Sequence, residues 1–171
     1  QHPVVLVRRR CPRGTSGPRA RIGAVEPADL LAREAIRDLV ARYNAYGDSG
    51  LLDRMLSLFT DDAVLEVGDV AYEGPDAIRG LFSGTVDRSA GAEGGPTYVR
   101  HSVTTHQIDL LDQGHATGRA YFTVLTRVGL DHWGRYLDDY RVVDGAWRFA
   151  RRRVLTDDFS TDSLFRPPSG G

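Results

Sequence analysis

One histidine lies in the middle of a segment that otherwise has the composition of a β-strand. His101 sits between Val99 and Val103 in TYVRHSVTTHQIDL (residues 97–110), and because side chains alternate along a strand, all three point to the same face. Such a histidine is either a packed residue satisfied by a neighbour or a proton-transfer group in an apolar pocket, since imidazole titrates near neutral pH. Both interpretations remain open from these residues alone.

A carboxylate is the second candidate for proton transfer. In GRYLDDYRVVDG (134–145), Tyr136, Asp138 and Tyr140 share one strand face. If this face is inward, Asp138 is a buried carboxylate that could act as an acid or as a partner of His101. The alternative is a structural hydrogen bond with one of the arginines in RFARRRV (148–154).

Other titratable residues of the body are expected at the surface. His106 falls on the opposite strand face from His101, which predicts an exterior or interface position. His115 lies in a turn and His132 beside a loop, so both are expected to be exposed to solvent. Glu66, on a short strand, is also expected to face solvent.

The first part of the body is predicted to be mainly helical. Pro27 and Asp29 signal a helix start, and Ile36, Leu39, Val40 and Tyr43 recur at helical spacing up to Gly47. A short second helix is expected in 48–59 and a third from Pro75, separated by paired strands at 61–67 and 70–74. The glycine-rich segment 83–96 is expected to be a flexible loop, most of which (84–96) could act as a lid.

Four long strands are expected after the helices, at 98–112, 115–128, 133–143 and 146–156. The sequences DQGH and VDGAW separate them as tight turns. The second strand has one apolar face, formed by Ala116, Gly118, Ala120, Phe122, Val124 and Val128. This pattern predicts an α+β fold with three N-terminal helices packed on a mostly antiparallel sheet.

Composition limits the possible chemistry. The 171 residues contain 22 basic side chains, all of them arginine, which excludes Schiff-base chemistry on a lysine. The single cysteine allows no internal disulfide, and no Cys/His spacing resembles a zinc site. No apolar run approaches the ~20 residues that span a bilayer. We therefore expect a cytoplasmic protein with no metal and no membrane association.

The ends differ from the body of the chain. Residues 1–25 contain six arginines and no acid, which could suit nucleic acid, but no aromatic residue interleaves them and the body is acidic. We expect a disordered Arg-rich extension at 1–25, one domain at 26–157 and a flexible tail at 158–171, with no nucleic-acid partner.

Several blocks of the body resemble a known family. The segments AIRDLVARYNAYGDSGLLDRMLSLFTDDAVLEV, YEGPDAIRGLF, RHSVTTHQI and GRYLDDYRVVDGAWRFARRRV are similar to SnoaL-like members of the nuclear transport factor 2-like superfamily. Relatives in this superfamily include polyketide cyclases, ketosteroid isomerase, scytalone dehydratase and bile acid 7α-dehydratase. The resemblance covers roughly residues 27–157 and implies a cone-shaped α+β barrel, in which a curved sheet surrounds a deep apolar pocket.

The resemblance also implies roles for single residues. His101 matches the pocket histidine that acts as general acid or base in dehydratases of this type, and Asp48 and Tyr43 match the groups that position it. Asp48 could instead cap the second helix, and Tyr43 could be plain core. The implied pocket is lined by Tyr136, Phe122, Val124, Val67 and Phe82.

Departures from the family pattern restrict the reaction. The second acid or base of the dehydratases falls at Val124 or Thr126, and the ketosteroid isomerase base falls near Val67; none of these side chains transfers a proton. The resemblance therefore leaves a minimal set of His101, Asp48 and Tyr43, with Asp138 as a further candidate. This set suits dehydration, double-bond isomerisation or cyclisation of an apolar carbonyl compound without a cofactor.

Two other functions remain open. The same fold occurs in non-catalytic modules that bind small molecules and in oligomeric assembly modules. Tyr98, His106 and Tyr121 are expected on an open outer sheet face, which predicts a homodimer or homotrimer. A monomer at micromolar concentration by light scattering would contradict that expectation.

Overall fold

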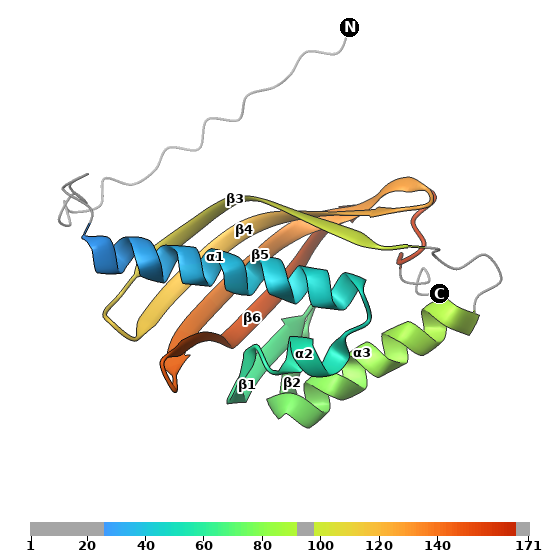
Figure 1. The fold of residues 1–171 in the computed structure, drawn as a ribbon. Coiled ribbons are helices and arrows are strands. Elements are labelled where there is room, and N and C mark those ends of the chain that lie inside the picture. The colour runs from blue at the N-terminus through green and yellow to red at the C-terminus, as the bar shows by residue number, and fades with distance from the viewer. Residues whose placement is uncertain (1–25, 92–97, 167–171) are drawn as a thin grey trace, which may run out of the picture.

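The fold is built on one sheet of six strands, and α1 lies along one face of this sheet (Figure 1). The computed structural model describes residues 26–91 and 98–166, with the side chains of 84–91 excepted. The helices are α1 (Pro27–Asp48), α2 (Leu52–Leu56) and α3 (Gly74–Gly91), and the strands are β1 (Phe59–Val67), β2 (Val70–Glu73), β3 (Arg100–Leu110), β4 (His115–Thr126), β5 (Gly129–Val143) and β6 (Ala146–Phe159).

The strand order confirms the predicted α+β class. The order in the sheet is β2-β1-β6-β5-β4-β3, and every neighbouring pair is antiparallel except β1 with β6. The four long strands thus form a meander, and the early β1–β2 hairpin joins it at the side of the last strand. None of the helices in the described ranges is long and apolar enough to cross a membrane.

The core lies between α1 and the inward face of the sheet. Ile36, Leu39, Val40 and Tyr43 of α1 are buried, as their helical spacing predicts. The aromatic rings of Tyr43, Phe59 and Phe149 meet there at centroid distances of 5.2–5.9 Å. Each such ring contributes a large apolar area, so this cluster fixes α1 against β1 and β6.

A two-residue turn sets the register of β5 and β6. Val143 pairs with Ala146, and both residues between them have positive φ: 51° at Asp144 and 75° at Gly145. An Asp-Gly pair suits a turn of this kind, because its twist matches that of the flanking strands. The turn predicted from VDGAW is therefore confirmed.

Two segments expected to be loops are structured in part. The third helix continues through Gly91, so the loop expected at 83–96 is wrong for its first nine residues; 92–96 and the extension 1–25 lie outside the described residues. At the other end, β6 runs two residues past position 157. Residues of 160–166 then bond back to the sheet, where a flexible tail was expected: the Ser160 N–H donates to the Asp131 carbonyl at 2.7 Å.

A β-bulge in β3 turns His106 inward. The register of β3 with β4 shifts between Thr104 and Gln107, and Thr105 has a φ of 51°. The extra residue reverses the alternation of faces, so His106 reaches the buried Tyr140, with 3.3 Å between Nε2 and the hydroxyl oxygen. The exterior position expected for His106 is therefore wrong, while Tyr98 and Tyr121 are exposed.

Candidate active site

His101 and Asp48 form a hydrogen-bonded pair between β3 and the end of α1. The ring Nδ1 lies 2.6 Å from Oδ1 of Asp48, and the His101 backbone N–H donates to Oδ2 at 3.0 Å. Asp48 is the last residue of α1, whereas the residue preceding α2 is Leu51, with no side-chain cap. Asp48 therefore holds the histidine and does not cap the second helix.

This pair fixes the chemistry that the imidazole can perform. Because a carboxylate accepts the Nδ1 proton, the neutral ring keeps its lone pair on Nε2. Among the described residues, none bonds to that nitrogen. The side chains of His101 and Asp48 are 27% and 11% exposed, so the ring is accessible while its partner is nearly buried. The arrangement suits a group that exchanges protons through Nε2.

Apolar side chains lie next to this histidine on the inward face. Val124 is the cross-strand partner of His101 and is fully buried. The rings of Phe122 and Tyr136 stack with centroids 4.6 Å apart, and the Tyr136 hydroxyl donates to Oδ1 of Asn44 at 3.3 Å. Three of the five residues expected to line a pocket are thus grouped beside His101.

The other two expected lining residues lie elsewhere. Val67 is at the end of β1, where it pairs with Val70 and Val154 and is 36% exposed. Phe82 of α3 packs against the larger core cluster. The structure therefore gathers only the β4 and β5 residues of the expected pocket around the histidine.

Asp138 meets an arginine and not His101. Its carboxylate accepts from Nε and Nη2 of Arg152 at 2.8 and 2.7 Å, and from the Tyr140 hydroxyl at 2.8 Å. No described contact joins Asp138 to His101. The Asp138 carboxylate therefore makes a structural hydrogen bond with an arginine and is not a partner of His101.

Arg152 is the buried residue that sequence reasoning missed. Its guanidinium carbon lies 4.1–4.2 Å from the ring centroids of Tyr43, Tyr136 and Phe149. Burial alone would lower the pKa of Arg152, but the charge and hydrogen bonds of Asp138 outweigh it and raise that pKa. The cation is therefore permanent.

Two tyrosines near this cation remain protonated. Burial raises the pKa of Tyr43 and of Tyr136. Both hydroxyls therefore keep their protons near neutral pH. No described contact joins Tyr43 to His101, so the structure places Tyr43 with Arg152 and not directly on the histidine.

His132 is a second histidine on the inward face, where solvent exposure was expected. Its side chain is only 14% exposed, and its Nδ1 lies 2.9 Å from Oδ1 of Asp131. His115, by contrast, has a side chain 57% exposed, as expected. Glu66 is on the outer face but lies under Arg151 and Arg153, which leaves its side chain 16% exposed. Among the described residues, no cluster of His, Cys, Asp or Glu could hold a metal ion.

The family follows from the sequence of this domain. Residues 28–153 match the SnoaL-like domain. The chain belongs to the SnoaL-like family. The match covers nearly all of the domain expected at 26–157, and a search of curated proteins found no match.

Solved structures share the SnoaL-like fold at low sequence identity. A candidate scytalone dehydratase from Novosphingobium aromaticivorans is 19% identical, with a TM-score of 0.67 over 82% of this chain and 98% of that one. The hexachlorocyclohexane dehydrochlorinase LinA-type3 from Novosphingobium barchaimii is 22% identical, with a TM-score of 0.66 over 82% and 98%. Rv3472 from Mycobacterium tuberculosis, of unknown function, is 27% identical, with a TM-score of 0.66 over 82% and 81%. The fold is therefore one in which lyases occur beside proteins without a known activity.

Proposed function

We propose that this SnoaL-like protein is a cofactor-independent lyase or isomerase of an apolar, polyketide- or steroid-like carbonyl compound. The observation that carries the proposal is the hydrogen-bonded pair of His101 and Asp48 beside the apolar cluster of Phe122, Val124 and Tyr136. A carbonyl compound that lies on this cluster is next to an imidazole of fixed orientation that can exchange a proton with it.

His101 exchanges a proton with the substrate through Nε2. Asp48 holds the ring through two hydrogen bonds and stabilises the imidazolium when the ring is protonated. The protonated Tyr43 hydroxyl is the candidate donor to the enolate oxygen as negative charge develops. Dehydration, double-bond isomerisation and cyclisation all proceed through such an enolate.

Asp138 has no catalytic role in this proposal, because its charge is already matched by Arg152. We retain the expectation that the protein is a homodimer or homotrimer with no nucleic-acid partner. Exposed Tyr98 and Tyr121 support that assembly.

Mass spectrometry of a metabolite extract tests the proposed activity. An extract of the source cells is incubated with wild-type protein, with His101→Gln and with His115→Gln, which changes an exposed histidine away from the site. We expect one species to lose the mass of one water, or to shift in retention at constant mass. This change should occur with wild type and His115→Gln and be lost with His101→Gln.

A different outcome would favour the binding-module function. If no species changes and one compound stays bound equally to wild type and His101→Gln, the protein binds without catalysis. In that case His101 is a core histidine.

A further inference from the structure

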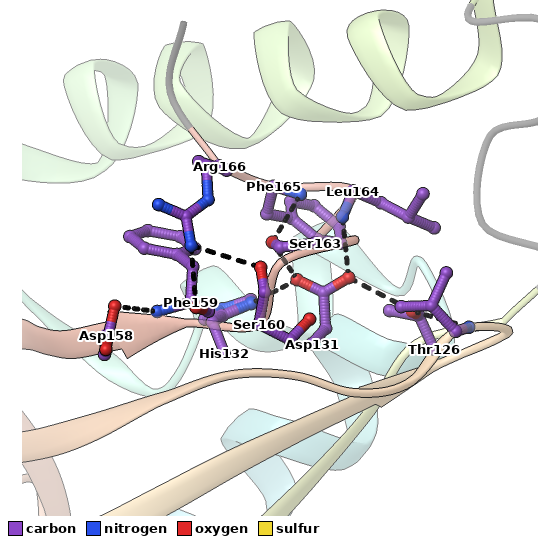
Figure 2. A network of polar contacts seen from close by, with 11 residues as sticks. Thr126, Asp131, His132, Asp158, Phe159, Ser160, Ser163, Leu164, Phe165 and Arg166 are labelled. Atoms are coloured by element: carbon purple, nitrogen blue, oxygen red, sulfur yellow. Dashed lines mark hydrogen bonds and ion pairs between the residues drawn. The ribbon is translucent and has the colours of Figure 1, made fainter. Parts of the chain in front are cut away.

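A second aspartate–histidine pair lies near the start of β5 (Figure 2). Asp131 is fully buried. Its carboxylate accepts hydrogen bonds from the Thr126 hydroxyl at 3.1 Å, the Ser163 hydroxyl at 2.6 Å and the Leu164 N–H at 2.9 Å, beside its contact with Nδ1 of His132. Figure 2 shows the segment 160–166 passing over this carboxylate and the imidazole.

These hydrogen bonds fix the tautomer of His132. Burial would raise the pKa of Asp131, but the donors around it outweigh burial and lower that pKa. Asp131 is therefore an ionised acceptor, so Nδ1 of His132 carries the proton and Nε2 of the neutral ring has the lone pair. No residue in the described ranges bonds to Nε2 of His132.

His132 and His101 belong to one row of the sheet. His101 pairs with Val124 across β3 and β4, and Val124 pairs with His132 across β4 and β5. Residues directly opposite in a ladder point to the same face. Two strand spacings separate the histidine backbones, which is about 10 Å. The two imidazoles therefore flank Val124 from opposite sides.

The His132 ring has a more apolar environment than the His101 ring. His132 packs among the rings of Phe122, Phe159 and Phe165 at 5.4–6.1 Å. Burial lowers its pKa; Asp131 opposes this, and the charge of His101 lowers it further. Arg166 is a further charged group in this region and lies over the Phe159 ring. A positive charge on His101 therefore disfavours protonation of His132.

We propose that His132 is a second catalytic residue, the base that removes the substrate proton while His101, held by Asp48, donates a proton to the leaving group. The inference rests on the proposed function and deepens it. In a dehydration, the C–H bond next to the carbonyl breaks and its proton moves to Nε2 of His132, which leaves the electron pair in an enolate. The electron pair forms the C=C bond, the C–O bond breaks, and the departing oxygen takes the Nε2 proton of the His101 imidazolium and leaves as water. Solvent returns the proton from His132 to His101.

Two synthetic ketones separate the roles of the two rings. The probes are 4-phenoxybutan-2-one and 4-(4-nitrophenoxy)butan-2-one, which eliminate a phenol by the same bond changes. Phenoxide needs a proton to leave readily, whereas 4-nitrophenoxide leaves without one. Elimination by wild type, His132→Gln, His101→Gln and the control His115→Gln is followed as kcat/KM for each ketone.

We expect His132→Gln to lower kcat/KM by about 100-fold or more for both ketones, because both require proton removal. His101→Gln should lose more with the phenoxy ketone than with the nitrophenoxy ketone. If His132→Gln keeps wild-type rates while His101→Gln does not, the inference is wrong and the proposed function stands. Loss in His132→Gln with the phenoxy ketone alone makes His132 the donor and also overturns the assignment.

An NMR measurement decides the role of His132 without turnover. Wild-type protein inert toward both ketones counts against the proposed function. In that event the ¹⁵N shifts of the imidazoles still report the tautomer of His132 and its titration. A proton on Nδ1, with a pKa of His132 that rises in His101→Gln, supports the inference. A proton on Nε2, or a titration unaffected by His101→Gln, overturns it.

Discussion

Arg152 and Asp138 lie in the interior with side chains 0% and 1% exposed, and two hydrogen bonds join the guanidinium to the carboxylate. Three aromatic rings surround the guanidinium, and its Nη1 has no hydrogen-bond partner. Taking two charges out of water is costly, and their attraction repays that cost only while both partners are present. The pair is therefore sensitive to the loss of either member.

We predict that Arg152→Met and Asp138→Leu each lower the free energy of unfolding by about 3–5 kcal/mol, because each leaves one buried charge unpaired. The double variant should recover most of this loss, since no charge remains. A double-mutant cycle from denaturant unfolding measures the coupling. A double variant as unstable as the sum of the single variants would show that the two charges do not act as a pair.

At the residue scale, the sequence predicts the histidine and its partner better than the buried arginine. His101 and Asp48 are both predicted site residues, and their side chains form a hydrogen bond. Arg152 could not be chosen from RFARRRV by alternation, because the register of β5 with β6 shifts between Asp139 and Tyr140. Phe149 and Arg152, an odd number of residues apart, are both buried as a result. A single inserted residue in a strand leaves no clear sequence signal.

At the scale of the elements, close approach of β5 and β6 depends on one glycine. A Cβ at Gly134 would lie 2.1 Å from the Leu155 carbonyl oxygen and 2.9 Å from the Phe122 ring. The backbone of β6 would have to move, and with it the stack of Phe122 on Tyr136. Gly134 therefore supports the apolar cluster beside His101.

We predict that Gly134→Ala lowers the free energy of unfolding by about 1–3 kcal/mol or more through overpacking. The matched control is Gly80→Ala in α3, where a Cβ meets nothing within 4 Å. There the same substitution should stabilise by about 0.5–1 kcal/mol, because alanine favours helix. Thermal unfolding of both variants tests the contrast; equal shifts would show that the β5–β6 approach is not tight.

The helices and strands themselves were predicted well, but several boundaries and faces were not. Periodicity placed α1 and the four long strands within a few residues of their observed ends. The segment after Phe82 contains four glycines before Pro96 and was expected to be a loop, yet α3 continues through Gly91. The positions of His106 and His132 also depend on tertiary structure. A bulge in β3 turns His106 inward, and the segment 160–166 covers the start of β5 at His132.

For the whole molecule, two partly buried histidines predict a stability that depends on pH. Burial lowers the pKa of both His106 and His132 below the usual 6.5. The unfolded chain therefore binds protons that the folded protein does not bind as pH falls below 6.5. Their contribution to stability is complete above pH 6.5 and is lost as pH falls through the lowered pKa values.

We expect the midpoint of denaturant unfolding to fall between about pH 7 and pH 5, where few carboxylates titrate. His106→Gln should reduce this slope, because it removes one of the two groups, whereas the exposed-site variant His115→Gln should leave it unchanged. A midpoint that is constant over this range would contradict the burial of these two imidazoles as neutral rings.

The position of β6 also determines when the domain can fold. This last strand lies between β1 and β5 and supplies the only described link from the β1–β2 hairpin to the meander. During synthesis, β1 has no β6 to pair with and α1 has no completed sheet to cover until residues 146–159 leave the ribosome. Long-range pairing of this kind slows folding, and the apolar face of α1 is exposed for that time. Translation of nearly the whole domain must therefore precede its folding, and until then the nascent chain exposes apolar surface that can aggregate.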